Sequence, residues 1–391
     1  LAIVEKALGP EHPSVATSLN NLAWLHADLG NPQLSLEYVR RAVAIHRARA
    51  SETGGREAGR LSEQRSKRGV FLFHIKTALA MEDPSERAAL VGEAFESAQL
   101  ASTHQAAQAI ARMAARFASG NDGLAAQVRE HQDALTRRRT LDGLVLKAAS
   151  APPEKRDASK EAALRQALRE TEQRLETIDQ RLASTFPRYA ELTRRTPVTL
   201  PALQSLLGPD EAMVVYASGG EHTFAFALRR DRVMARRIEL GARALAEKVT
   251  ALRQALDLTG LEALPAFNTP LAFELYQQLF EPLEPLVEGA RHLFVVPDGA
   301  LTSLPFGILV SEAPSGSDYR EVAWLAKRYA MSTLPSAASL RALRAFAERA
   351  GASRPFLGVG DPTLEGGGGA SRSVKLASLY TRGGVADVTA V

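Results

Sequence analysis

The stretch His292–Gly307 contains side chains whose types and spacing could do chemistry at the edge of a sheet. An apolar run ends in a Pro-Asp-Gly turn, and a second apolar run with its own proline follows at once. The turn places Asp298 at the carboxyl end of a predicted strand, the edge where open α/β sheets bind ligands. We therefore take Asp298 as a candidate substrate-pocket residue. The alternative is a turn residue whose carboxylate caps the local backbone.

Ser303 lies in the same stretch but lacks the surroundings of a nucleophile. A nucleophile elbow reads Gly-x-Ser-x-Gly, whereas this sequence reads Leu-Thr-Ser-Leu-Pro. The eight histidines are scattered, and no two of them have the i, i+4 spacing of a helical metal site. His222, at a predicted hairpin tip, and His292, at a strand start, have no sequence neighbour that would make either a catalytic base. We predict no catalytic residue and no metal site in this chain.

Two glycine-rich stretches lack the remainder of a nucleotide-binding motif. Gly358 and Gly360 end a predicted strand, but no third glycine opens a helix at the dinucleotide spacing. The run Gly366–Gly369 is followed by Ala-Ser-Arg, not by the Lys-Ser/Thr pair of a phosphate loop. We therefore predict no cofactor, and we interpret the second stretch as a surface loop.

Composition limits the function classes further. The chain has 391 residues, 48 basic and 44 acidic side chains and no cysteine. The absence of cysteine excludes disulfides, thiolate zinc sites and a cysteine nucleophile within this sequence. The charges are interleaved without a basic stripe, which argues against nucleic acid, and no apolar run approaches the roughly 20 residues of a membrane span. The compartment stays open, with the cytoplasm favoured.

Residues 1–50 have the pattern of a helical repeat. "LAI" at the start recurs as "VAI" at Val43–Ile45, a period of 42 residues. Pro13 and Ser14 can begin a helix, and Gly30-Asn31-Pro32 ends it and opens the next one. A helix pair of this kind cannot bury its apolar face alone, so it implies stacked neighbours. The segment "ALGPEHPSVATSLNNLAWLHADLG" resembles a tetratricopeptide repeat of the kinesin-light-chain type, which implies a protein partner.

Three further segments separate the repeat from the predicted sheet. Residues 51–68 are polar and glycine-bearing and indicate a linker, whereas 69–150 carry helical spacing throughout. Within 151–196, apolar residues step by four and three like a heptad seam. The seam spans under three heptads, which favours an antiparallel hairpin over a free coiled coil. Its members are Leu164, Leu168, Thr171, Leu175, Ile178 and Leu182.

From residue 197 to 391, short β-prone runs alternate with amphipathic helical stretches. The strand candidates are "AMVVYASGG", "HTFAFALRR", "DRVMARRIEL", "HLFVVPD", "YAMSTLPS" and "RPFLGVGDP". Helices are predicted at 242–258, 271–286 and 337–348. Alternation of this kind predicts a largely parallel α/β sheet, so the fold class is α + α/β, a helical array and hairpin followed by a sheet domain.

The sheet region resembles a CHAT domain, a caspase-like domain that accompanies tetratricopeptide repeats in bacteria. The matching segments are "HLFVVPDGALTSLPFGILV", "WLAKRYAMSTLPSAASL" and "PFLGVGDPTL", and "TPVTLPALQSLLGPDEAMVVYASGG" is similar to the part that precedes them. The resemblance covers about 186 to 391 and implies an incomplete caspase-like sheet.

In the family that the resemblance suggests, a histidine ends one strand and a cysteine ends the next, and together they form a peptidase dyad. Neither motif occurs in this sequence, so the chain is expected to stop inside the CHAT domain and to be inactive alone. The first hypothesis is therefore a fragment of a CHAT cysteine peptidase-like protein whose repeats bind a protein partner or protein substrate. The alternative is a non-enzymatic scaffold.

Overall fold

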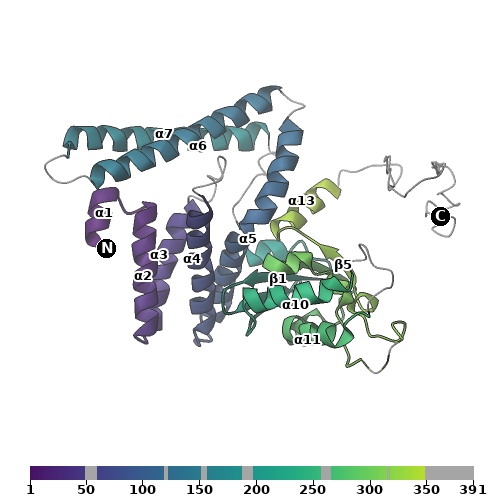
Figure 1. Cartoon of the computed structure of the whole chain (residues 1–391). Coiled ribbons are helices and arrows are strands. Elements are labelled where there is room, and N and C mark those ends of the chain that lie inside the picture. The colour runs from purple at the N-terminus through teal and green to yellow at the C-terminus, as the bar shows by residue number, and fades with distance from the viewer. Residues whose placement is uncertain are drawn as a thin grey trace, which may run out of the picture. The chain divides into compact units, whose positions relative to one another are not determined.

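Two kinds of structure follow one another along the chain, helices up to residue 185 and a sheet with its own helices from residue 200 (Figure 1). The computed structural model describes residues 1–48, 60–118, 122–150, 156–186, 197–256, 266–314, 316 and 318–347. The side chains of 60–66, 103–122, 342 and 345–347 are outside this description. The predicted strand "RPFLGVGDP" and the run Gly366–Gly369 also lie outside the described residues.

The N-terminal helices have bounds that local signals in the sequence explain. The bounds are α1 Ala2–Leu8, α2 Pro13–Asp28, α3 Pro32–Ala48, α4 Arg60–Ala80, α5 Arg87–Ala118, α6 Asp122–Ala149 and α7 Ala158–Thr185. At the start of α2, the His12 side chain accepts a hydrogen bond from Ser14 N at 3.1 Å, and Pro13 occupies the first helical position. Gly30, with φ 73°, terminates this helix before Pro32 starts the next. The predicted repeat pair therefore forms.

Helix α4 begins within the segment that was predicted to be a linker. It starts at Arg60, whereas the polar composition of 51–68 indicated a loop up to Arg68. From Leu61 to Arg68 the chain contains no glycine or proline and mostly good helix formers. Because helix propagation costs little once a packed turn exists, the buried part of α4, from Val70 onward, extends its helix back through this polar stretch.

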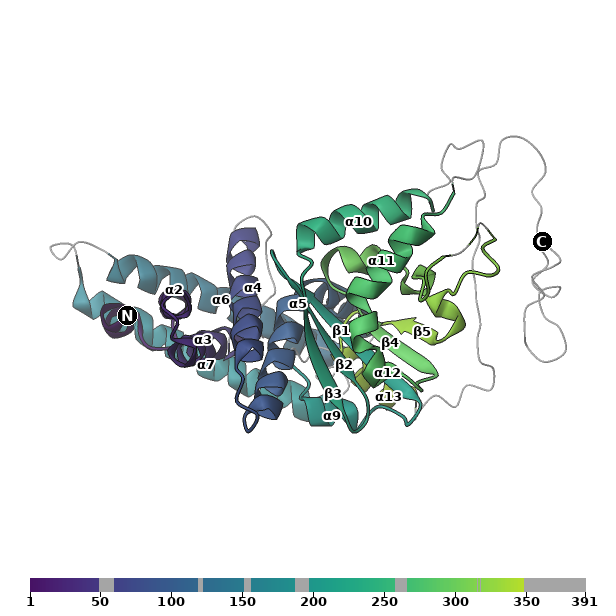
Figure 2. The same cartoon turned by 90° about the horizontal axis from the view of Figure 1, so that it is seen from below.

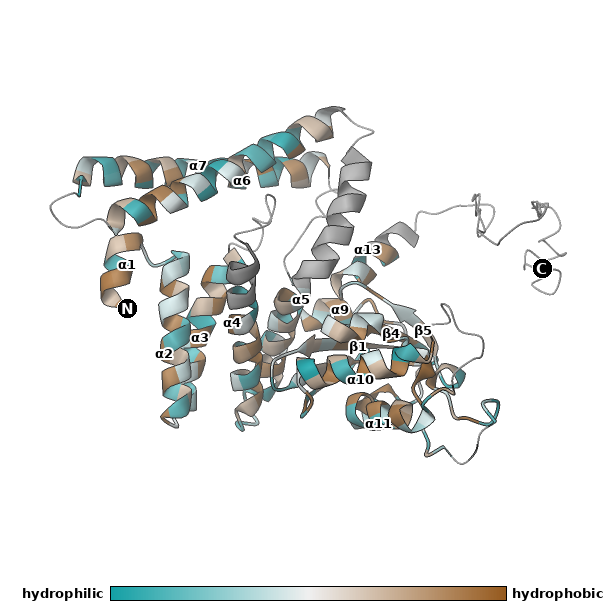
Figure 3. Cartoon of the chain, in the orientation of Figure 1, coloured by the Kyte–Doolittle hydropathy of each residue, from teal (hydrophilic) through white to brown (hydrophobic). Residues whose placement is uncertain are grey.

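Helices α6 and α7 form an antiparallel hairpin. Arg138 pairs with Glu172 at 3.1 Å, and His131 approaches Asp179 at 3.0 Å, so residue numbers rise along one helix as they fall along the other. The heptad positions Leu175, Ile178 and Leu182 are buried, while Leu164 and Leu168 are half-buried. Figure 3 shows frequent hydrophilic residues along both helices. Helix α7, from the segment 151–196, therefore packs antiparallel on α6, as the short heptad pattern predicted.

The sheet is mixed, not largely parallel. Its strand order is β3-β2-β1-β4-β5. Strands β1 and β2 pair antiparallel, as do β2 and β3, whereas β1, β4 and β5 run parallel. The connections at 219–222 and 229–232 are too short for a crossover, so those pairs must be antiparallel. The bounds are β1 Glu211–Ser218, β2 Thr223–Leu228, β3 Val233–Ile238, β4 His292–Val296 and β5 Ala330–Thr333.

Different helices cover the two faces of the sheet (Figure 2). One face shares a continuous apolar core with α2 to α5, α9 and α13, and the other packs on α10, α11 and α12. Phe95 of α5 meets Phe226 of β2 edge-on, with ring centroids 5.7 Å apart. The Gln99 side chain accepts from Val198 N and donates to Val198 O. The bounds are α9 Leu200–Gln204, α10 Ala242–Gln254, α11 Thr269–Leu279, α12 Glu284–Val287 and α13 Ala338–Ala347.

None of the described helices combines the length and the apolar character that a membrane span requires.

Candidate functional site

The chain turns sharply at the carboxyl end of β4. Asp298 still has an extended backbone, with φ −137° and ψ 151°. Gly299 then adopts a φ of 57°, in the left-handed region that favours glycine, and a Cβ at this position would lie 3.6 Å from Ser218 Cβ. A 3₁₀ turn, Gly299–Ser303, follows. The Pro-Asp-Gly sequence thus ends the strand and keeps Asp298 close to the end of β1.

The carboxylate of Asp298 is buried and hydrogen-bonded on the side of β1. Its Oδ2 accepts from the backbone N–H of Ser218 at 2.7 Å. The same oxygen accepts from an Nη of Arg68 at 2.5 Å, and Oδ1 lies 3.4 Å from the other Nη. Only 9% of the Asp298 side chain is exposed. Its negative charge is therefore compensated by a guanidinium from α4 and by a backbone amide from the neighbouring strand.

Asp298 caps the backbone of a different strand, so it differs from the local turn cap that the sequence offered as the alternative. It also does not stand free in an open pocket. A carboxylate that works as an acid or base must reach its substrate, and here Arg68 occupies the position next to it. The role of Asp298 in a substrate pocket stays a prediction.

Arg68 is the residue of this cluster that sequence reasoning missed. It is separated from Asp298 by 230 positions, and it lies in the polar stretch that was interpreted as linker. No local motif marks it, because its partner is brought to it only by the packing of α4 beside the sheet.

A second polar pair lies at the opposite, amino end of the parallel strands. His292 Nε2 and Ser332 Oγ are 3.0 Å apart, and the imidazole stacks on Phe294 with centroids 4.5 Å apart. Sequence reasoning found no partner for His292, since Ser332 belongs to β5, 40 positions away. A serine and a histidine in contact are two parts of a nucleophilic site. The pair sits on the sheet face beside α13, and among the residues that the structure describes no carboxylate hydrogen-bonds to the imidazole.

The glutamate that pairs with His292 in the strand register is bound to an arginine. Glu211, at the start of β1, accepts from Arg344 of α13 and from Gly208 N at 2.7 Å. Burial by itself would raise the pKa of Glu211, but the hydrogen bonds from Arg344 and Gly208 and the positive charge of Arg344 lower it below the ordinary value. Glu211 therefore anchors α13 to the sheet. The arrangement fits a structural contact better than a catalytic triad.

The other candidates stay apart from these clusters. Ser303 is exposed at the end of its 3₁₀ turn, and His292 reaches Ser332 instead of it. His222 lies near Glu239, with Nδ1 3.0 Å from a carboxylate oxygen at the β1–β2 tip. Within the described residues, no group of three histidine or acidic side chains is arranged to hold a metal ion.

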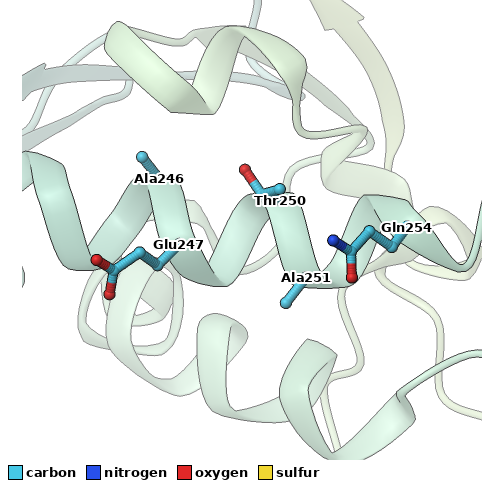
Figure 4. Close-up of a pocket in the computed structure, with 5 residues that line it drawn as sticks. All are labelled: Ala246, Glu247, Thr250, Ala251 and Gln254. Atoms are coloured by element: carbon cyan, nitrogen blue, oxygen red, sulfur yellow. The ribbon is translucent and has the colours of Figure 1, made fainter.

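Two hollows on the surface are lined by residues other than Asp298. One runs along the outer side of α10 and is lined by small side chains together with Glu247 and Gln254 (Figure 4). Another lies within the loop between Glu312 and Ala323. The first is open, and its one hydroxyl, on Thr250, has no histidine beside it in the lining, so neither its shape nor its chemistry indicates catalysis.

Comparison with known protein families gives two matches. Residues 1–48, which form α1 to α3, match the tetratricopeptide repeat. Residues 269–380, from α11 onward, match the CHAT domain. No curated protein matches the chain. Helices α1 to α3 and the segment that carries β4, the Asp298 turn and β5 thus lie within the two matched modules, a tetratricopeptide repeat and a CHAT domain.

Proposed function

We propose that this chain is the partner-binding and sheet-forming part of a CHAT peptidase-like protein, and that its helical repeat binds a protein. The observation that carries the proposal is the occurrence of both modules in one chain, the repeat at 1–48 and the CHAT domain at 269–380. Tetratricopeptide helices present an extended surface to partners, and CHAT domains resemble cysteine peptidases.

Helix α2 supplies the surface that fits a partner. Asn21, Trp24 and Asp28 are exposed and follow helical spacing, so they share one face. Trp24 is 44% exposed, yet its ring is stacked on the ring of Phe73 of α4, with centroids 4.1 Å apart. The Lys76 ammonium lies 5.8 Å from the same ring. A tryptophan that is exposed but already ordered loses little entropy on binding, as residues that dominate binding energy do.

The chain by itself is proposed to be inactive as a cysteine peptidase. The sequence contains no cysteine, so the thiolate that such chemistry requires cannot come from these residues. Asp298, which we keep as a substrate-pocket candidate, is paired with Arg68 in this conformation. Peptide hydrolysis would require a histidine and a cysteine supplied from elsewhere in the complete protein.

The test is to incubate the purified chain with fluorescently quenched casein and a mixed-sequence peptide library. We expect no cleavage above a buffer control. Cleavage that co-purifies with the chain, and that is abolished by Ser332→Ala or Ser303→Ala, would overturn the proposal and assign a serine mechanism.

A non-enzymatic scaffold is the second candidate, favoured by the absence of cysteine. The complete gene product distinguishes the two. Labelling of that product by a peptide acyloxymethyl ketone, a thiol-directed probe, supports the peptidase. A product without any reactive thiol, which binds its partner through α2, supports the scaffold, and Trp24→Ala should then weaken binding about tenfold or more.

A further inference from the structure

Arg68 joins three segments that are far apart in the sequence. One Nη donates to the carbonyl oxygen of Ala101 in α5 at 2.5 Å. The other donates to Ser218 O at 2.7 Å, at the end of β1, and to Asp298 beyond β4. A guanidinium presents its donors in a rigid plane, so a shift of Arg68 must disturb all three contacts together.

The same helix contacts α2 two turns further along. Phe73 lies under the Trp24 ring, and Lys76 lies near that ring. From Arg68 to Ala80 the helix is continuous and contains no proline, with Gly69 as its one glycine, so it has no proline kink between Arg68 and Phe73. Trp24 of α2 and the turn after β4 are therefore both in contact with one continuous helix.

The Asp298 contact is sensitive to small displacements. A buried carboxylate that loses its partner retains a large desolvation cost, and Asp298 would keep only the amide of Ser218. Gly299 follows directly and can adopt many backbone conformations. The cheapest response to loss of Arg68 is therefore a movement of Asp298 and Gly299 toward water, while Leu301 and Leu304 stay in the core. Such a movement would give the turn a second arrangement beside the one in the structure, as coupling between distant surfaces requires.

We propose that α4 couples the Trp24 face of α2 to the turn after β4, with Arg68 as the positioning residue that holds this turn closed over the carboxyl edge. The proposal rests on the proposed function only in taking the Trp24 face, formed by Asn21, Trp24 and Asp28, as the surface to which a partner binds. The contacts themselves require neither a partner nor a substrate.

The experiment is a double-mutant cycle on the full chain, read out by hydrogen exchange of peptides that span 298–305. Trp24→Ala removes the stacking between α2 and α4, and Arg68→Ala removes the hydrogen bonds from α4 to Asp298, Ser218 and Ala101. We expect Trp24→Ala to raise exchange in this peptide about tenfold in the parent chain, and by less than twofold in the Arg68→Ala background. An equal increase in both backgrounds, or none in the parent chain, overturns the coupling.

Leu25→Ala is the matched control. Leu25 neighbours Trp24 on α2 and is 51% exposed, and its aliphatic side chain has no ring that could stack on Phe73. It should leave exchange at 298–305 unchanged, and a similar increase for both variants would mean general loosening and would count against the proposal. If Arg68→Ala does not fold, Asp298→Asn replaces it, because the amide oxygen can still accept from Ser218 N. Since neither a partner nor a peptide enters this cycle, its failure is separate from failure of the proposed function.

Discussion

The hairpins α4–α5 and α6–α7 are alike in sequence pattern and unlike in what they support. Each is a pair of helices with apolar residues at three and four spacing. The side chains of α4 and α5 enter the core that one sheet face shares with the repeat. The α6–α7 pair closes over a small core of its own, with Leu124, Leu135 and Ile178 among its members. The α4–α5 pair is thus part of the α/β unit, and the α6–α7 pair is largely self-contained.

The contacts explain the difference. Phe95 of α5 contacts the sheet, and Gln99 of α5 hydrogen-bonds to Val198 before α9. Helix α4 adds the ion pair between Arg68 and Asp298. The links of α6–α7 to the repeat are few, and one of them is a hydrogen bond from Arg165 to Ala7 O. Apolar burial contributes most of the free energy of packing, and exposed ion pairs contribute little. If the chain is divided by its helical sequence pattern, α4 and α5 group with the other helices. If it is divided by which residues share a hydrophobic core, α4 and α5 group with the sheet.

The largest effect should come from Phe95→Ala. The ring is fully buried between α5 and β2, and its removal should cost about 3–5 kcal/mol. Since it belongs to the shared core, hydrogen exchange should rise both in α2–α3 and in β1–β2. Ile178→Ala, 1% exposed in α7, is the matched variant and should raise exchange only in α6–α7. If both variants loosen the sheet equally, the distinction between the two hairpins is wrong.

A smaller effect should follow from Glu93→Gln, and it should depend on pH. Glu93 of α5 receives two hydrogen bonds from Arg40 of α3 and lies 3.4 Å from His74 of α4. Burial alone would raise the pKa of Glu93, but hydrogen bonds and charges from His74 and Arg40 prevail and lower it to about 2 from an ordinary 4.5.

Because the folded pKa is the lower one, this carboxylate stabilises the fold above about pH 4.5, and the contribution is lost as pH falls toward 2. Since the side chain is 36% exposed, solvent screening limits the effect to about 1 kcal/mol. Urea unfolding of both chains from pH 7 to pH 3 measures it: the difference should shrink as pH falls. Glu82→Gln, an exposed change in the α4–α5 connection, is the control, and a difference independent of pH would contradict the assignment.

The smallest effect should come from Glu130→Gln in α6. Glu130 lies 3.1 Å from Arg174, which is 63% exposed, and 3.9 Å from Arg181. Exposed pairs of this kind contribute less than about 1 kcal/mol. The change in free energy of unfolding should be below that value in low salt and should vanish at about 1 M NaCl, where the Debye length is about 3 Å. A larger, salt-independent loss would show that α6–α7 depends on polar contacts more than its core suggests.

Much of the local structure could be predicted from the sequence. The ends of α2 and α3 follow from His12, Pro13, Gly30 and Pro32, and the five described strands lie where the β-prone runs are. The start of α4 could not be predicted, because its polar first turns are extended from a packed helix. The mixed sheet could have been inferred from the short Gly219–His222 connection, but the alternation of strands and helices dominated the interpretation.

Local side-chain order alone determined which segments are helices and strands, where the Pro-Asp-Gly turn falls, and that no cysteine chemistry can arise within these residues. Tertiary structure decided which of those segments act together. It brought Arg68 to Asp298 across 230 positions and Ser332 to His292 across 40. Periodicity and turn residues act over a few neighbours, whereas these contacts exist only when two hydrophobic faces have packed and fixed the distance between their polar edges.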